Sequence, residues 1–139
     1  MQRFTDICKK YNIALVYLFG SQQENALKLL KGQKAIIDDP LADIDVGVVF
    51  LSPIDRIPMR HKLYAQIYNE LEDIFFPYKL DLSFLQENHS VFQVEALKGI
   101  CIYSVSEQFK DDYEIRILQR AADFKYTLDK YNEEVLEKY

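Results

Sequence analysis

Two aspartates in the stretch DIDVGVVF, which runs from Asp43 to Phe50, have a spacing that suits chemistry. Alternate residues of a strand share a face, so Asp43 and Asp45 are expected on one side, about 6.6 Å apart along the strand. Unpartnered carboxylates there repel each other and lose hydration, and a cation between them removes that penalty. Hard oxygen ligands at this spacing suit Mg²⁺. Gly47 follows on the same face and is expected to leave room for a ligand, although a strand end in solvent also tolerates both acids.

A third acid lies in the stretch KLDLSFL, where Asp81 alternates with Leu80 and Leu82. Asp81 therefore faces away from that apolar pair. If this strand lies beside the strand of Asp43 and Asp45, the three carboxylates share a face and form a plausible two-metal site. Asp81 could also accept a proton from an attacking hydroxyl. Taken alone, it is equally well interpreted as a surface acid.

The dipeptide Gly20-Ser21 ends the apolar run IALVYLF. Ser21 and Glu24 form the pattern S-x-x-E, which predicts a capping box at a helix that begins at Ser21. The same geometry suits an anion, because Gly20 permits close approach of the backbone and a helix start presents free N–H groups. The dipeptide is therefore predicted to cap a helix, to bind phosphate, or to do both.

The elements that must position these residues alternate along the chain. Helices are expected over 2–11, 21–31, 58–75 and 89–98, and a long one from Ser106, as a possible cap, to the end. Strands are expected over 13–19, 43–50, 79–85 and 99–104. Four strands interleaved with helices predict an α/β domain built on one small sheet, with residues 1–139 as a single domain.

Composition excludes some classes of partner. Asp and Glu outnumber Lys and Arg by 22 to 17, which argues against an extended nucleic-acid interface but not against a nucleotide whose phosphates a metal ion neutralises. Neither a signal peptide nor a membrane span is evident, and Cys8 and Cys101 form no metal motif or disulfide framework. A cytoplasmic protein with a buried Cys101 thiol is expected. His61 and His89 are expected to be surface residues without partners.

The last helix carries an apolar seam with a period of 3.5 residues. Its members are Ile117, Ala121, Phe124, Leu128, Tyr131 and Val135, and a second apolar row accompanies only the first half. Two interpretations stay open. Either the whole helix lies on its own domain, or its end meets a helical partner or a second copy of the chain.

In this order, these features resemble the nucleotidyltransferase superfamily of the DNA polymerase beta type. The signature of that superfamily is a Gly-Ser, a spacer, an Asp-x-Asp and a third acid on a later strand, here Gly20, Ser21, Asp43, Asp45 and Asp81. The flanks LFGS and DIDVGVVF match as well. The resemblance covers the whole chain, and the size is similar to the minimal nucleotidyltransferases, the antitoxins of the MNT or MntA type.

The resemblance implies a polymerase beta-like fold, with a small mixed sheet of about four strands flanked by helices and a long C-terminal helix. It implies transfer of AMP from ATP to a tyrosine of a HEPN-type helical partner toxin. It further implies that Asp43, Asp45 and Asp81 hold one or two Mg²⁺ ions and carry the catalysis, and that Gly20 and Ser21 bind the nucleotide.

The chain departs from the pattern of the superfamily at two places. The spacer 22–42 is about twice the usual length, so it either extends the helix and adds a loop or brings Lys28, Lys31 or Lys34 toward the phosphates. Gln22 and Gln23 stand where the family often has an arginine. Two other functions stay open: a non-catalytic module that neutralises a helical partner by contact, and a transferase that acts on a small-molecule hydroxyl.

Overall fold

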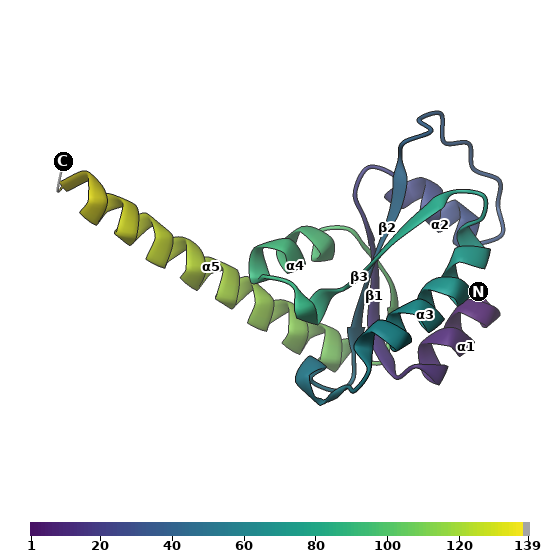
Figure 1. Ribbon diagram of the computed structural model, residues 1–139, viewed down its shortest axis with the longest axis horizontal. Coiled ribbons are helices and arrows are strands. Elements are labelled where there is room, and N and C mark those ends of the chain that lie inside the picture. The colour runs from purple at the N-terminus through teal and green to yellow at the C-terminus, as the bar shows by residue number, and fades with distance from the viewer. Residues whose placement is uncertain (138–139) are drawn as a thin grey trace.

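A computed structural model describes residues 1–137 of the chain as an α/β domain with a projecting helix (Figure 1). The helices are α1 (Gln2–Lys10), α2 (Gln23–Leu30), α3 (Arg60–Phe75), α4 (Ser90–Leu97) and α5 (Glu107–Glu137), with short 3-10 turns η1 (Ile54–Arg56) and η2 (Leu85–Glu87). The strands are β1 (Ile13–Phe19), β2 (Asp43–Phe50), β3 (Lys79–Phe84) and β4 (Ile100–Ser104). The predicted fold class and the alternation of elements are confirmed.

The four strands form one mixed sheet in the order β3-β2-β1-β4. Strand β1 is antiparallel to β2 and β4, whereas β2 and β3 are parallel. The end of β1 therefore lies at the same edge of the sheet as the starts of β2 and β3. This edge is where the sequence places Gly20 and the three aspartates.

Helices cover both faces of the sheet, because alternate side chains of β2 are apolar in both directions over its second half. On one face, Ile44, Val46 and Val48 pack in a core with residues of α1, α2 and α3. On the other face, Tyr17 and Val49 pack against α4 and the first half of α5. Burial of these apolar side chains is the main stabilising contribution to the fold.

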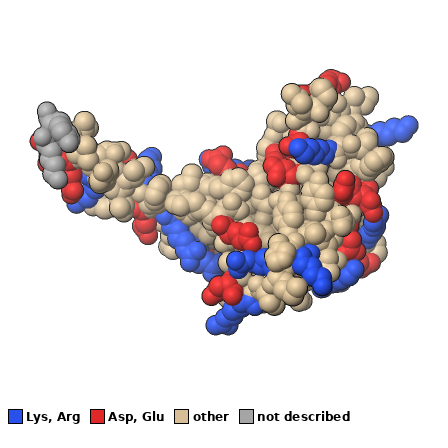
Figure 2. Space-filling view, viewed as in Figure 1, with Lys and Arg blue, Asp and Glu red and all other residues tan. Residues whose placement is uncertain are grey.

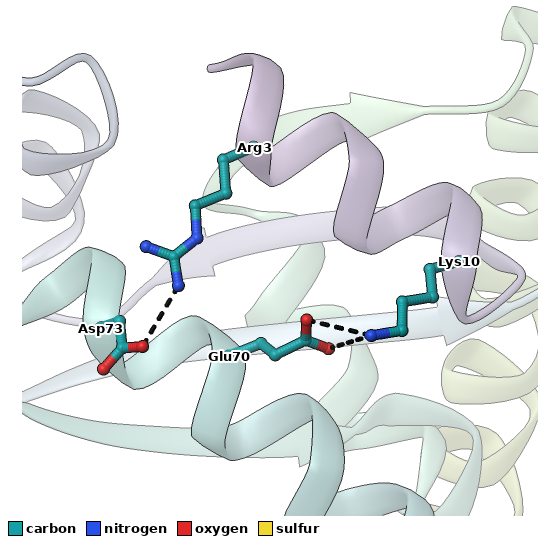
Figure 3. Close-up of polar contacts among 4 residues, drawn as sticks. All are labelled: Arg3, Lys10, Glu70 and Asp73. Atoms are coloured by element: carbon teal, nitrogen blue, oxygen red, sulfur yellow. Dashed lines mark hydrogen bonds and ion pairs between the residues drawn. The ribbon is translucent and has the colours of Figure 1, made fainter.

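Helices α1 and α3 lie side by side on the first face and are joined by two ion pairs (Figure 3). Arg3 Nη2 lies 3.1 Å from Asp73 Oδ2, and Lys10 Nζ lies 3.2 Å from Glu70 Oε1. Both pairs are largely solvent-exposed, so each contributes at most about 1 kcal/mol. The packing beneath them, not the charges, holds the two helices together.

Two helix starts differ from the sequence predictions. Helix α2 begins at Gln23 with Gln22 as its N-cap and no side-chain cap bond, so the capping box predicted from Ser21 and Glu24 is wrong. The turn after Gly20 takes up Ser21 and Gln22 before the helix begins. The expected cap at Ser106 is present, since its hydroxyl accepts a hydrogen bond from the Phe109 N–H at 3.1 Å.

His89 is exposed, as the sequence predicted, but it is not without partners. It is the N-cap of α4, and its Nδ1 accepts a hydrogen bond from the Val91 N–H at 3.2 Å. Its ring also packs edge-on against Phe124 of α5, with ring centroids 4.4 Å apart. The imidazole therefore ties the start of α4 to the middle of α5.

Cys101 is half-buried and has no disulfide partner.

The second half of α5 extends away from the domain, as Figure 1 shows for the green-to-yellow end of the chain. Leu128 and Tyr131 are 44% and 62% exposed, whereas Ile117, near the start of the seam, is buried. The interpretation in which the whole helix lies on its own domain is therefore wrong for the described residues.

Among residues 1–137, none of the helices has the length and apolar character to cross a membrane.

Candidate active site

The three predicted aspartates gather at one edge of the sheet. Asp45 of β2 and Asp81 of β3 are register partners on neighbouring parallel strands, and Asp43 is the register partner of Lys79. Because residues two apart on a strand share a face, Asp43, Asp45 and Asp81 all lie on the same face. Asp43 and Asp45 are half-buried and Asp81 is exposed, so the group is open to solvent from the β3 side.

Gly20 completes this edge from the neighbouring strand. It follows β1, whose last residue, Phe19, is the register partner of Asp45. Its φ of +78° is a left-handed conformation, and a Cβ at this position would collide with the Asp45 carboxylate. Only glycine avoids both the backbone strain and the collision. The backbone at Gly20 therefore lies directly against the Asp45 carboxylate, and the exposed Ser21 follows it.

Crowding of the carboxylates changes the acidity of one of them. The pKa of Asp45 is raised to about 6, first because the side chain is partly removed from water and then because Asp81 and Asp43 lie close by. Removal from water and negative neighbours both disfavour the ionised form. The site is therefore short of positive charge, and a bound cation would relieve the repulsion.

Gly47 does not serve the site as the sequence predicted. It is buried, and a Cβ there would lie 2.8 Å from Cδ2 and 2.9 Å from Cγ of Leu85. The missing side chain accommodates Leu85 of η2, which belongs to the core on this face. The expected room for a ligand is thus filled by the protein itself.

A family comparison supports the signature that these residues form. The family model described as polymerase beta, nucleotidyltransferase matches residues 2–108. The chain belongs to this nucleotidyltransferase family. The matched range includes the Gly-Ser turn and all three aspartates, whereas most of α5 lies beyond it.

Solved structures share the fold of this nucleotidyltransferase over nearly its whole length. A toxin-antitoxin crystallised with AMP-PNP covers 97% of both chains at 13% identity, with a TM-score of 0.64. A variant of the MntA-HpeT toxin-antitoxin with two Asp-to-Glu substitutions two positions apart also covers 97% of both chains, at 12% identity and with a TM-score of 0.66. A tri-AMPylated HEPN toxin from Shewanella oneidensis in complex with MNT antitoxin gives 15% identity and 0.59, over 97% of this chain and 94% of that chain. No curated protein sequence matches the chain significantly.

The donor set of the nucleotidyltransferase suits a hard divalent cation. Within residues 1–137, no group of three His, Cys, Asp or Glu side chains is already arranged as a metal site. Mg²⁺ is commonly held by only one or two carboxylates, with waters and substrate phosphates as the other ligands. The half-buried Asp43 and Asp45, next to Asp81 and deficient in positive charge, fit that kind of site.

Two residues at this edge were not singled out from the sequence. Lys79 is exposed, is the register partner of Asp43 and shares its face, but it forms no ion pair with an aspartate among the described residues. The sequence carries a signal for this position, because Lys79 lies two residues before Asp81 in KLDLSFL and therefore shares its face. The ring of Phe92 from α4 packs edge-on against Phe19, with centroids 5.8 Å apart, and forms an apolar wall beside Asp45 for which the sequence carries no signal.

The long spacer forms a short helix and a loop, which leaves two of the predicted lysines at a distance. Lys28 is exposed in the last turn of α2, and Lys31 follows its end, roughly 12 Å along the axis from its start near Gly20. The loop is held by Tyr78, whose hydroxyl donates to the Ala35 carbonyl at 2.9 Å. At the start of α2, the side-chain oxygen of Gln23 is buried without a hydrogen-bond partner among the described residues, which leaves an acceptor for a donor from water or a ligand.

Proposed function

We propose that this nucleotidyltransferase moves AMP from ATP to a hydroxyl, and that the acceptor is a tyrosine of a HEPN-type helical partner protein, which makes the chain an antitoxin. The observation that carries the proposal is the meeting of Asp43, Asp45 and Asp81 with Gly20 at one sheet edge. Family membership supports nucleotidyl transfer in general. The structural neighbours include a toxin-antitoxin with AMP-PNP and a tri-AMPylated HEPN toxin with MNT antitoxin, which supports the nucleotide and the acceptor.

In the proposed reaction, the acceptor oxygen attacks the α-phosphorus of ATP. The bond from that phosphorus to the oxygen bridging to the β-phosphate breaks, and pyrophosphate leaves. Asp81 is the carboxylate nearest to the open side of the site, so it is placed to take the proton of the hydroxyl or to orient it. One or two Mg²⁺ ions, when bound by Asp43, Asp45 and Asp81, would neutralise charge on the phosphates and the leaving group.

The Gly-Ser turn is proposed to bind the remaining phosphates. Gly20 permits the triphosphate to approach the backbone beside Asp45, and the N–H groups at the start of α2 follow Ser21 directly. Because α2 has no side-chain cap, its first N–H groups stay available for an anion. The apolar wall of Phe19 and Phe92 offers a surface on which an adenine ring can stack.

The exposed stripe of α5 is proposed to dock the partner. Leu128 and Tyr131 are exposed, and they belong to the second half of α5, which projects from the domain in Figure 1. A helix in this position fits a helical partner through its apolar stripe. A protein acceptor is also favoured over a small hydroxyl compound, because the structural neighbours include a tri-AMPylated HEPN toxin in complex with MNT antitoxin.

The test is intact-mass analysis of the proteins that co-purify with the chain from its source cells, before and after addition of ATP and Mg²⁺. The proposal expects a partner that gains one or more adenylyl groups with the native chain. Transfer should disappear with Asp43→Asn and persist with Asp111→Asn, a matched loss of one exposed carboxylate on α5.

Other outcomes of the same experiment would support one of the two alternative functions or refute the proposed site. A stable partner that never gains mass, and whose toxicity Asp43→Asn still neutralises, would replace the transferase with a non-catalytic binding module. Release of pyrophosphate only in the presence of a hydroxylated small molecule would move the acceptor away from protein. Full transfer by Asp43→Asn would refute the proposed site.

A further inference from the structure

A second pocket lies at the opposite end of the sheet from the aspartates. It has a volume of about 480 Å³ and is bounded by the end of α1, the end of β2, the connection through η1, and the first turns of α3. Phe50 forms part of its floor and lies five residues beyond Asp45 on the same strand, which is roughly 16 Å. The pocket is therefore separate from the candidate active site.

The charged side chains that line this pocket are all basic. They are Lys10 from α1, Arg56 from η1 and Lys62 from α3. Lys10 is partly neutralised by Glu70, as Figure 3 shows, but within residues 1–137 neither Arg56 nor Lys62 forms an ion pair. Blue Lys and Arg atoms lie along the lower margin of the domain in Figure 2, with red Asp and Glu atoms between them. In a chain of net charge −5, this local excess of positive charge needs a reason.

The start of α3 adds to the positive potential of the pocket. Pro58 and Met59 line it, and Met59 is the N-cap of this helix of 16 residues. No side chain caps the helix and no acid lies in its first turn. Its first N–H groups and the positive end of its dipole therefore remain uncompensated, which favours an anion at this position.

The uncharged residues that line the pocket indicate which kind of molecule carries the anionic group. Apolar surface comes from Ile57, Met59 and Leu63, an aromatic ring from Tyr11, and hydrogen-bonding groups from Ser52 and Gln66. A bare oxyanion requires no such walls, and the volume lies within the range of pockets for small organic ligands. From this combination we propose that the pocket binds a nucleoside monophosphate, with the phosphate at Arg56 and Lys62 and the base against the apolar and aromatic walls.

This inference goes beyond the proposed transfer reaction and does not depend on it. No acid lines the pocket, so it offers neither metal ligands nor a general base, and a ligand there would be bound and not converted. A nucleotide held at the far end of β2 would instead act as a sensor or a stabilising ligand of the domain. Its affinity should not require Mg²⁺, because the cations are supplied by side chains.

The test is a titration of the isotopically labelled full chain with AMP in the presence of EDTA, followed by amide NMR shifts. The proposal expects saturable shifts at Ser52, Lys62 and Gln66. The double variant Arg56→Gln/Lys62→Gln should weaken AMP binding at least tenfold. Both side chains are exposed, so the variant should fold, and its spectrum will show whether it does.

The matched control removes the same charge elsewhere. Lys9→Gln/Lys125→Gln also deletes two exposed positive charges, both outside the pocket, and should leave AMP affinity unchanged. Three results would overturn the proposal: shifts confined to Gly20 and its neighbours, equal weakening by the control variant, or equal affinity for inorganic phosphate. None of them would affect the transfer reaction, because mass analysis with Asp43→Asn tests that separately.

Discussion

Asp45 and Asp81 face each other across two parallel strands, and this pairing determines the electrostatics of the site. Each is the register partner of the other, so their side chains emerge on one face at the spacing of adjacent strands. Partial burial and the neighbouring carboxylates raise the pKa of Asp45 to about 6. Repulsion between two ionised carboxylates at this spacing lowers the free energy of unfolding, so stability alone gives no reason to keep both acids. The arrangement makes sense if a cation occupies the site during function.

The raised pKa of Asp45 predicts a loss of stability as pH rises. The carboxyl has a pKa of about 6 in the folded chain and an ordinary pKa of 3.8 when freely solvated, so the folded state binds more protons between these values. The free energy of unfolding therefore falls as pH increases through this range. Because the group is partly solvated, the expected decrease is about 1 kcal/mol rather than the full value of the shift. Urea unfolding in EDTA at pH 4 and pH 7.5 measures it.

The variant Asp45→Asn isolates this contribution. It should raise the free energy of unfolding at pH 7.5 relative to the native chain and flatten the dependence on pH, while it abolishes transfer. The control Asp111→Asn should keep the native dependence, because this acid lies on α5 away from the site. Equal pH dependence in Asp45→Asn and the native chain would show that another group is responsible.

Gly20 and Gly32 provide a matched pair of glycines with left-handed backbone. Their φ angles are +78° and +76°, but a Cβ at Gly20 would meet the Asp45 carboxylate whereas one at Gly32 meets nothing within 4 Å. We expect Gly32→Ala to cost about 1 kcal/mol for the backbone alone. Gly20→Ala should cost more and should also reduce transfer at least tenfold, since it displaces Asp45. Thermal unfolding and adenylyl transfer measured on both variants test this, and equal behaviour of the two would contradict it.

Strands β1 and β2 could be predicted at their observed bounds, because buried apolar runs and the alternation of Asp43 and Asp45 are local properties of the sequence. The meeting of Asp45 with Asp81 could be predicted only on condition that the two strands are neighbours, which depends on the sheet order. The predicted cap at Ser21 is wrong because Ser21 and Gln22 form a turn after the left-handed Gly20, so the helix begins only at Gln23. The partners of His89 come from α4 and α5, and no local pattern encodes the contact with Phe124.

Gly47 is another position whose surroundings could not be predicted from the sequence. The sequence indicates that a small residue lies on the face of Asp45, but not whether a ligand or another side chain fills the space. The structure places Leu85 there. Gly47→Ala should therefore destabilise the fold by about 1–3 kcal/mol through overpacking. Urea unfolding should show that the double variant Gly47→Ala/Leu85→Ala costs less than the sum of the two single changes, and strict additivity would contradict the contact.

The exposed stripe of α5 yields the last prediction, which separates docking from catalysis. Leu128→Lys/Tyr131→Lys changes two exposed side chains beyond the contact of Phe124 with His89, so the free energy of unfolding should stay within about 0.5 kcal/mol of the native value. If the partner docks on this stripe, the variant should lose co-purification of the partner by at least tenfold. Glu133→Gln/Glu137→Gln, a matched control, changes the net charge by the same two units at exposed positions of the same half of the helix. Equal loss in both variants would indicate an effect of charge, and retention in both would place the docking surface elsewhere on the domain.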